Sequence, residues 1–152
     1  MALNQALVGT SYPPMAYEVG REKVREFAAA IGERSPACHD VDAARALGHP
    51  DLVAPPTFAV VATRGPQIAV IEDPDLGLDF SRVVHGDQRF SFVRPIVAGD
   101  RLVVTASVDS ARTLAGNDIL TIRSDVRDES GADVATVWAT LVARAPEAEA
   151  AS

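Results

Sequence analysis

The chain has a single cysteine, Cys38, among its 152 residues. One cysteine excludes an internal disulfide framework and a cysteine-rich metal site. The sequence also has no lysine- or arginine-rich cluster, and its net charge is −7, which argues against nucleic acid as a partner. We expect neither a metal ion nor a cofactor.

An uninterrupted apolar run long enough for a membrane is missing as well. A spanning helix needs roughly 20 such residues, and Arg64-Gly65-Pro66 breaks the most apolar stretch, Leu52–Ile71, near its middle. Met1–Val8 lacks the charged-then-apolar layout of a signal peptide. We therefore expect no membrane association and a cytoplasmic protein.

The rest of the sequence is organised around this apolar stretch. Phe58, Val61, Ala62 and Gly65 recur at helical spacing, and apolar residues occupy the other sides too. Such a helix is one that other elements enclose. Because proline kinks a helix, the sequence predicts a buried helix from about Pro56 to Arg64, followed by a bend.

The segments before this helix alternate between short elements and turns. A short strand is expected over 17–19, and an amphipathic helix over 21–31, where apolar residues fall on one face. Gly32 is suited to end that helix. Asp40 is a plausible N-cap for a second helix over 41–47.

After Phe80 the period of the pattern changes from helical to alternating, typical of strands. Four alternating segments are separated by turn residues at 98–100, 115–117 and 128–131. Closely spaced strands predict an antiparallel sheet whose apolar face covers the central helix. The expected fold class is α+β, as one domain over 1–145 with a disordered acidic tail at 146–152.

Four stretches, in order, resemble the MaoC-like hydratase/dehydratase family of the hotdog fold, especially its N-terminal, substrate-binding halves. Gly32–His39 resembles the family's Gly-Asp-x-Asn-Pro-x-His motif, and Leu52–Phe58 resembles the start of its central helix. The segments 84–88 and 94–102 resemble its His-Gly-Glu-Gln element and its strand-turn-strand. The sequence is most similar to the small actinobacterial subunits that pair with a second hotdog chain.

The resemblance implies a hydro-lyase that interconverts 2-enoyl and (R)-3-hydroxyacyl thioesters of CoA or acyl carrier protein. One base and one acid must reach the same oxygen, and backbone N–H groups near Thr57–Ala59 would polarise the thioester carbonyl. The residues implied to contact substrate are Cys38, Pro56, Thr57, Phe58, His85, Gly86 and Gln88.

The chain departs from the family motif at the positions that carry the chemistry. Glu33 occupies the aspartate position, Cys38 occupies the histidine position, and His39 lies one residue late. A catalytic pair, if present, would be Glu33 and His39. Since active sites tolerate only small positional errors, we expect a degenerate site whose partner supplies the catalysis.

Several residues also have non-catalytic interpretations. Cys38 could simply fill space in its loop, because a nucleophile would need a thiolate-stabilising setting. His85 could orient its loop or line the pocket. Arg64 could bind a phosphate, or form an ion pair at an interface or at the edge of the core.

We therefore carry three hypotheses. The favoured one is a dehydratase subunit that shapes the acyl tunnel and stabilises a catalytic hotdog partner, in fatty-acid or polyketide-type metabolism. The second is a self-sufficient homodimeric hydratase that uses Glu33 and His39. The third is a non-enzymatic acyl-thioester-binding module.

Overall fold

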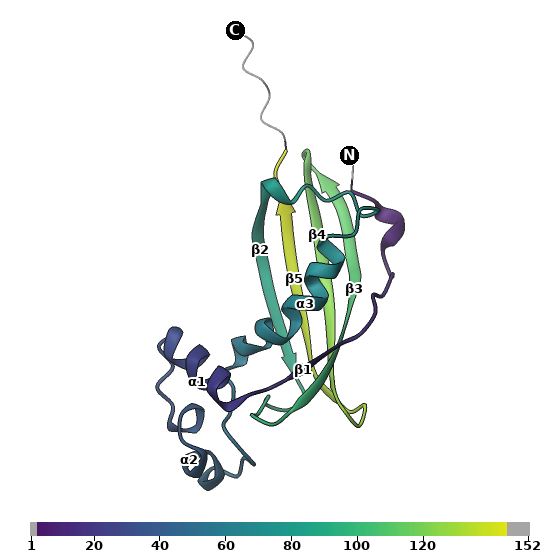
Figure 1. Ribbon diagram of the computed structural model, residues 1–152. Coiled ribbons are helices and arrows are strands. Elements are labelled where there is room, and N and C mark those ends of the chain that lie inside the picture. Colours follow the sequence, from purple (N-terminus) through teal and green to yellow (C-terminus); the bar gives the residue numbers. More distant parts are fainter. Residues whose placement is uncertain (1–2, 146–152) are drawn as a thin grey trace.

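The computed structural model describes residues 3–145 and consists of one five-stranded antiparallel sheet, a central helix and a small helical lobe (Figure 1). The predicted α+β hotdog arrangement is confirmed. The strands, in spatial order, are β1 (Met15–Glu18), β3 (Arg101–Leu114), β4 (Asn117–Asp128), β5 (Asp133–Ala143) and β2 (Val83–Phe92). The helices are α1 (Arg21–Ala30), α2 (Val41–Ala46) and α3 (Ala59–Ile71), with 3-10 turns η1 (Gln5–Leu7), η2 (Pro36–Cys38), η3 (Pro56–Phe58) and η4 (Phe80–Arg82).

The long β3–β4 hairpin shows how local sequence sets the register of the sheet. Its turn residues Ala115 and Gly116 have φ values of 50° and 78°, the left-handed pair that matches the twist of a tight hairpin. This turn pairs Leu114 with Asn117 and places alternate apolar residues of both strands on the inner face. The resulting apolar surface is what α3 covers.

The central helix is longer than the sequence predicts. It continues through Pro66 to Ile71 as one helix, so the predicted end at Arg64 is wrong. Proline removes only one backbone donor, and the residues after it are held by tertiary contacts. Pro66 and Val70 are buried, and the side chain of Gln67 donates to Ser124 on β4 at 3.4 Å.

The central helix is also less enclosed than expected. Its buried side carries Phe58 and Ala59, both with no exposed surface, and packs mainly on β3 and β4. Its other side is open: Val60 is 38% exposed, and Arg64 is exposed. The sheet of this chain curls around one side of α3 only, and the side toward β2 lacks a cover within residues 3–145.

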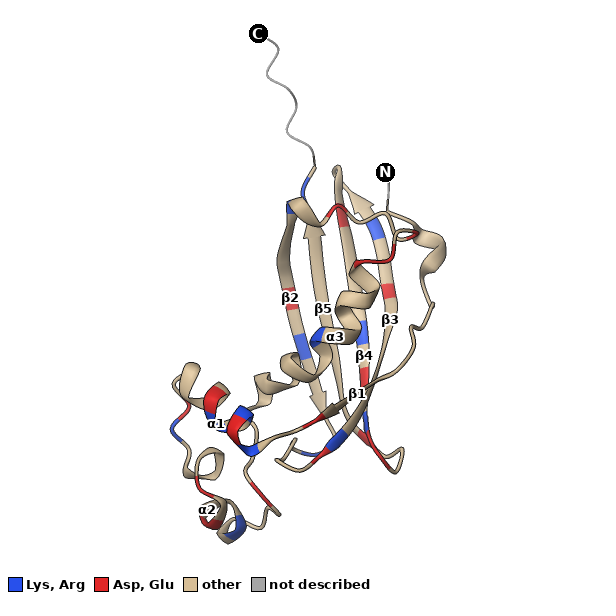
Figure 2. Cartoon of the chain, in the orientation of Figure 1, with Lys and Arg blue, Asp and Glu red and all other residues tan. Residues whose placement is uncertain are grey.

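The helical lobe lies beside the start of α3 (Figure 1). The predicted helices are confirmed to within one residue at their ends, and Asp40 caps α2 by accepting from the backbone N–H of Asp42 at 2.8 Å. Both acidic and basic residues lie along α1 (Figure 2). The predicted tail at 146–152 lies outside the described residues.

No helix within residues 3–145 combines the length and the apolar character that a bilayer crossing requires.

The segment from Phe80 onward is not composed of strands alone, because η4 forms a 3-10 turn just before β2. Asp79 caps this turn by accepting from the backbone N–H of Ser81 at 3.1 Å, which explains the short helical element.

Candidate functional site

The loop between α1 and α2 carries three of the predicted site residues, Glu33, Cys38 and His39. Gly32, with a φ of 74°, lets the chain leave α1. Pro36 then begins η2. The loop is therefore short, and its backbone is fixed at both ends.

Both side chains of the predicted catalytic pair are hydrogen-bonded to the backbone of their own loop. The Oε1 atom of Glu33 accepts from the N–H of Ser35 at 2.8 Å. The Nε2 atom of His39 lies 2.7 Å from the carbonyl oxygen of Glu33. Because a carbonyl only accepts, this ring nitrogen carries the proton. The loop thus brings the two residues together without pairing the carboxylate with the imidazole.

Cys38, which occupies the histidine position of the family motif, points into the interior. It is 4% exposed, and burial, followed by the nearby charge of Glu33, raises the pKa of its thiol. A thiol with a raised pKa stays protonated at neutral pH and is a poor nucleophile. Its packing matches a space-filling role, and contact with a substrate stays a prediction.

The segment that leads into α3 adjoins this loop. The carbonyl of Ala37 accepts from the N–H of Val53 at 2.9 Å, just before η3. Pro56 and Thr57 are exposed, whereas Phe58 is fully buried between Phe27 and other core residues. Substrate contact by these three residues stays a prediction.

The N–H groups expected to polarise a thioester carbonyl are mostly committed elsewhere. The N–H of Phe58 donates to Pro55 at 2.8 Å, and that of Ala59 donates back to Pro56. Both bonds arise because the chain enters α3 through a 3-10 turn, which uses donors that an ordinary helix start leaves free. Of the three groups, only the N–H of Thr57 has no acceptor within residues 3–145.

The second predicted group, His85, Gly86 and Gln88, lies on the edge strand β2. A β-bulge falls at Gly86, where an added Cβ would lie 3.1 Å from Val142. His85 contacts the carbonyl of Asp87 through Nε2 at 2.9 Å, and Gln88 donates to the carbonyl of Trp138 at 2.8 Å. These side chains therefore stabilise the edge of the sheet.

The two predicted groups lie in different parts of this chain. The lobe with Glu33 and His39 lies beside the first turn of α3, whereas β2 begins at the opposite end of the sheet (Figure 1). His85 and Gly86 are the third and fourth residues of β2. The chain on its own does not assemble them into one site.

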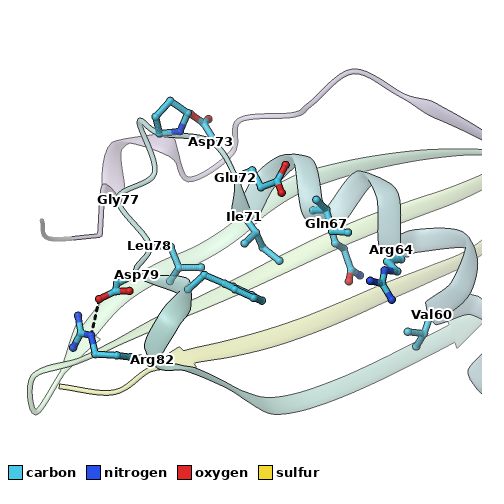
Figure 3. A pocket seen from close by; sticks show the side chains of 13 residues that line it. Val60, Arg64, Gln67, Ile71, Glu72, Asp73, Gly77, Leu78, Asp79 and Arg82 are labelled. Atoms are coloured by element: carbon cyan, nitrogen blue, oxygen red, sulfur yellow. Dashed lines mark hydrogen bonds and ion pairs between the residues drawn. The ribbon is translucent and has the colours of Figure 1, made fainter. Parts of the chain in front are cut away.

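A groove between the open side of α3 and the segment leading to β2 was not predicted (Figure 3). Its volume is about 990 Å³. One wall is a stripe on α3, and the other carries Leu78 and Phe80. The stripe consists of Val60, Arg64, Gln67, Ile68 and Ile71. Their spacing of three and four residues was present in the sequence, but the apolar residues on every side of α3 concealed it.

A small polar network fixes the side chain of Gln67 in the groove wall. Its Nε2 atom donates to the hydroxyl oxygens of Thr63 at 3.3 Å and Ser124 at 3.4 Å. Thr63 and Ser124 are fully buried, so these bonds satisfy hydroxyls that would otherwise be costly to bury. The network joins α3 to β4.

Three of the five charged residues that line the groove form an ion pair or a side-chain hydrogen bond. Asp79 contacts Arg82 at 2.7 Å, and hydrogen bonds from Ser81 and Arg82 lower the pKa of Asp79 to about 2. Asp73 accepts from the hydroxyl of Tyr12 at 2.6 Å. Within residues 3–145, the guanidinium group of Arg64 has neither a hydrogen bond nor an ion pair.

A metal site is not apparent in the part of the chain that the structure describes. No three His, Cys, Asp or Glu side chains there lie close enough together to hold a metal ion.

Comparisons with known proteins agree with this fold. The model of the "FAS1-like, dehydratase domain region" family matches residues 6–137. The chain is 62% identical over 148 residues to a UPF0336 protein of Streptomyces coelicolor, covering 97% of this chain and 99% of that protein.

Two solved structures are also similar. One belongs to the HadBC (3R-hydroxyacyl-ACP dehydratase) complex of Mycobacterium tuberculosis, with 35% identity, a TM-score of 0.78, and coverage of 87% of this chain and 92% of that chain. The other is a MaoC-like dehydratase with 35% identity and a TM-score of 0.86. This match covers 94% of this chain and 44% of that longer chain. The chain therefore belongs to the FAS1-like dehydratase-region family, among the MaoC-like proteins of the hotdog fold.

Proposed function

We propose that this chain is the tunnel-forming, non-catalytic subunit of an (R)-specific 3-hydroxyacyl-thioester dehydratase, acting with a second hotdog chain that carries an intact Asp/His motif. The observation that carries the proposal is the hydrogen bonding of Glu33 and His39 within their loop. Both side chains are held by backbone groups of that loop.

Dehydration of a 3-hydroxyacyl thioester removes a proton from C2 and the hydroxyl from C3, and hydration reverses both steps. A base and an acid must therefore act on one substrate from adjacent positions. The Oε1 atom of Glu33 already accepts from Ser35, and the Nε2 proton of His39 already goes to a carbonyl, so one polar atom of each side chain is committed to the loop. These commitments favour a partner as the source of both groups.

The open side of the chain supports the role of a partner subunit. Among the described residues 3–145, the edge strand β2 pairs only with β5, and an exposed edge invites a further strand. The groove of about 990 Å³ beside it falls in the size range of small-molecule pockets. A second hotdog chain added at β2 would cover this groove and enclose an acyl chain.

Two relatives support this assignment. HadBC is by its name a complex and a 3R-hydroxyacyl-ACP dehydratase. In the longer MaoC-like dehydratase, the matched region occupies 44% of the chain, which leaves room for a second domain of similar size. We infer that the substrate is an acyl thioester of CoA or of acyl carrier protein.

Reconstitution tests the proposal. Candidate hotdog chains with an intact Asp and His are purified with this chain, and hydration of crotonyl-CoA and of a long-chain 2-enoyl thioester is measured. Glu33→Gln in this chain should leave the complex nearly as active as the wild type. Substitution of the partner's motif aspartate by asparagine should remove activity, by about 100- to 10,000-fold.

The same assay separates the other two hypotheses. Turnover by this chain alone that Glu33→Gln abolishes would establish a homodimeric hydratase. Saturable binding of an acyl thioester with no turnover, alone or with any intact-motif chain, would establish a binding module.

A further inference from the structure

The open face of α3 contains one charge in the middle of an otherwise uncharged stripe. Arg64 lies between Val60 and the residues Gln67, Ile68 and Ile71 on the groove side of the helix. Figure 3 shows Arg64 and Gln67 next to each other on this wall. Figure 2 shows one basic band within α3, with acidic residues only beyond its last turn.

We propose that this face is the contact surface for a non-identical hotdog chain whose central helix presents a carboxylate to Arg64. The inference rests on the proposed function, which supplies the hotdog partner, and it adds the chemistry by which this chain selects that partner over a second copy of itself.

The geometry of a homodimer explains why Arg64 would disfavour a second copy of this chain as the partner. Two copies that pair antiparallel through their β2 edges are related by a two-fold axis perpendicular to the sheet. Both α3 helices then lie antiparallel on the same side of the extended sheet, with their open faces toward each other. When the two-fold axis passes opposite the middle of the contact stripe, residues there approach the same residues of the other copy.

Arg64 is close to that middle position. The stripe runs from Val60 to Ile71, so an antiparallel match opposes Arg64 to Gln67 of the other copy. The two Arg64 residues are then offset by three residues, or about 4.5 Å along the helix axes. Covering the groove would bring two like charges together in a partly desolvated space, where their repulsion is weakly screened.

Within residues 3–145, the carboxylates that line the groove are engaged elsewhere or lie beyond the stripe. Asp73 is engaged by Tyr12, and Asp79 by Arg82. Glu72 caps the far end of α3, five residues beyond the position that Arg64 faces. A partner with a carboxylate opposite Arg64 converts the repulsion into an attraction, so the same residue disfavours the homodimer and favours the heterodimer.

A charge-swap experiment on the full chain tests this inference without the natural partner. Sedimentation equilibrium measures the dimer dissociation constant of the wild type, of Arg64→Leu, of Arg64→Glu, and of a 1:1 mixture of wild type and Arg64→Glu. Removing the charge in Arg64→Leu should tighten self-association by about tenfold or more, and the mixture should form a heterodimer tighter than either component alone.

Arg112→Leu and Arg112→Glu are the matched controls, because Arg112 is an exposed arginine on β3, away from the β2 edge. They should leave the dissociation constant unchanged. Thermal unfolding of each variant checks that the fold is retained.

Three results would overturn the inference. Weaker self-association of Arg64→Leu would mean that Glu72 of a second copy pairs with Arg64. The other two results are an unchanged dimer dissociation constant in all Arg64 samples, and monomers in every sample including the mixture. Each of these can occur while a reconstituted complex turns over substrate, which would leave the proposed function intact. Conversely, turnover by the isolated chain would remove the proposed function without altering the charge-swap result.

Discussion

The ring nitrogen Nε2 of His39 lies 2.7 Å from the main-chain carbonyl oxygen of Glu33, six residues earlier in the same loop. A catalytic imidazole must present a nitrogen to its substrate, and here the protonated nitrogen is used to hold the loop together. The carboxylate of Glu33 is likewise turned toward the N–H of Ser35. The histidine, displaced by one residue from the family motif, thus contributes a hydrogen bond to the structure of its loop.

Cys38 should react slowly with alkylating reagents in the native chain. Burial and the charge of Glu33 raise the pKa of its thiol, so little thiolate is present at neutral pH. The rate of alkylation by iodoacetamide should be at least about tenfold lower than in the unfolded chain. Glu33→Gln should increase the native rate, because it removes the negative charge. Native alkylation as fast as that of the unfolded chain would contradict the buried placement.

The core around the start of α3 should be sensitive to truncation. Phe58 has no exposed surface and makes edge-on ring contacts with Phe27 and Tyr17. The ring centroids are 5.5 Å apart for Phe27 and 6.3 Å apart for Tyr17. Phe58→Ala should reduce the free energy of unfolding by about 3–5 kcal/mol in urea titrations. The matched control is Phe80→Ala, because Phe80 is 61% exposed and should change stability by less than about 0.5 kcal/mol. Similar losses for the two variants would count against the assigned core.

Two glycine substitutions should have opposite effects on stability. An added Cβ at Gly86 would lie 3.1 Å from Val142 Cγ2 and 3.3 Å from the carbonyl oxygen of Thr140. Gly86→Ala should therefore destabilise the chain by about 1 kcal/mol. Gly65 lies within α3, and its added Cβ would meet only Met15 at 3.4 Å. Gly65→Ala should stabilise by about 0.5–1 kcal/mol, and a loss there would show that the helix is packed more tightly than described.

Stability should fall in acid partly through the cap of η4. Hydrogen bonds from Ser81 and Arg82 lower the pKa of Asp79 from 3.8 to about 2. A lowered folded-state pKa stabilises the fold above the unfolded value, and this contribution is lost as pH falls from about 4 to about 2. The thermal midpoint of Asp79→Asn should decline less steeply over this window than that of the wild type. Equal slopes would show that the cap does not persist in solution.

The fold could be predicted from the sequence because its signals are local. Alternation marked the strands, turn residues such as Ala115-Gly116 marked the hairpin, and Asp40 marked a helix start. The length of α3 could not be predicted, because the continuation past Pro66 depends on burial of Val70 against distant strands. Local rules for proline do not contain that information.

The candidate site was only partly predictable for a similar reason. The motif located Glu33, Cys38 and His39 in one loop, but the orientation of each side chain depends on which backbone groups lie within reach. The groove as a whole could not be predicted, since its second wall comes from Leu78 and from the 3-10 turn η4, which begins at Phe80, and not from α3. Which side of an all-apolar helix stays open is decided by the sheet.

The most direct test of the central claim is turnover by the chain purified alone. Hydration of a short and a long-chain 2-enoyl thioester is followed by loss of the conjugated-thioester absorbance, for the wild type, Glu33→Gln and His39→Ala. The account predicts rates near the buffer background for all three, since Oε1 of Glu33 and Nε2 of His39 are both hydrogen-bonded to the backbone of their own loop. Wild-type turnover at the level of an ordinary hydratase, lost in Glu33→Gln or His39→Ala, would contradict it.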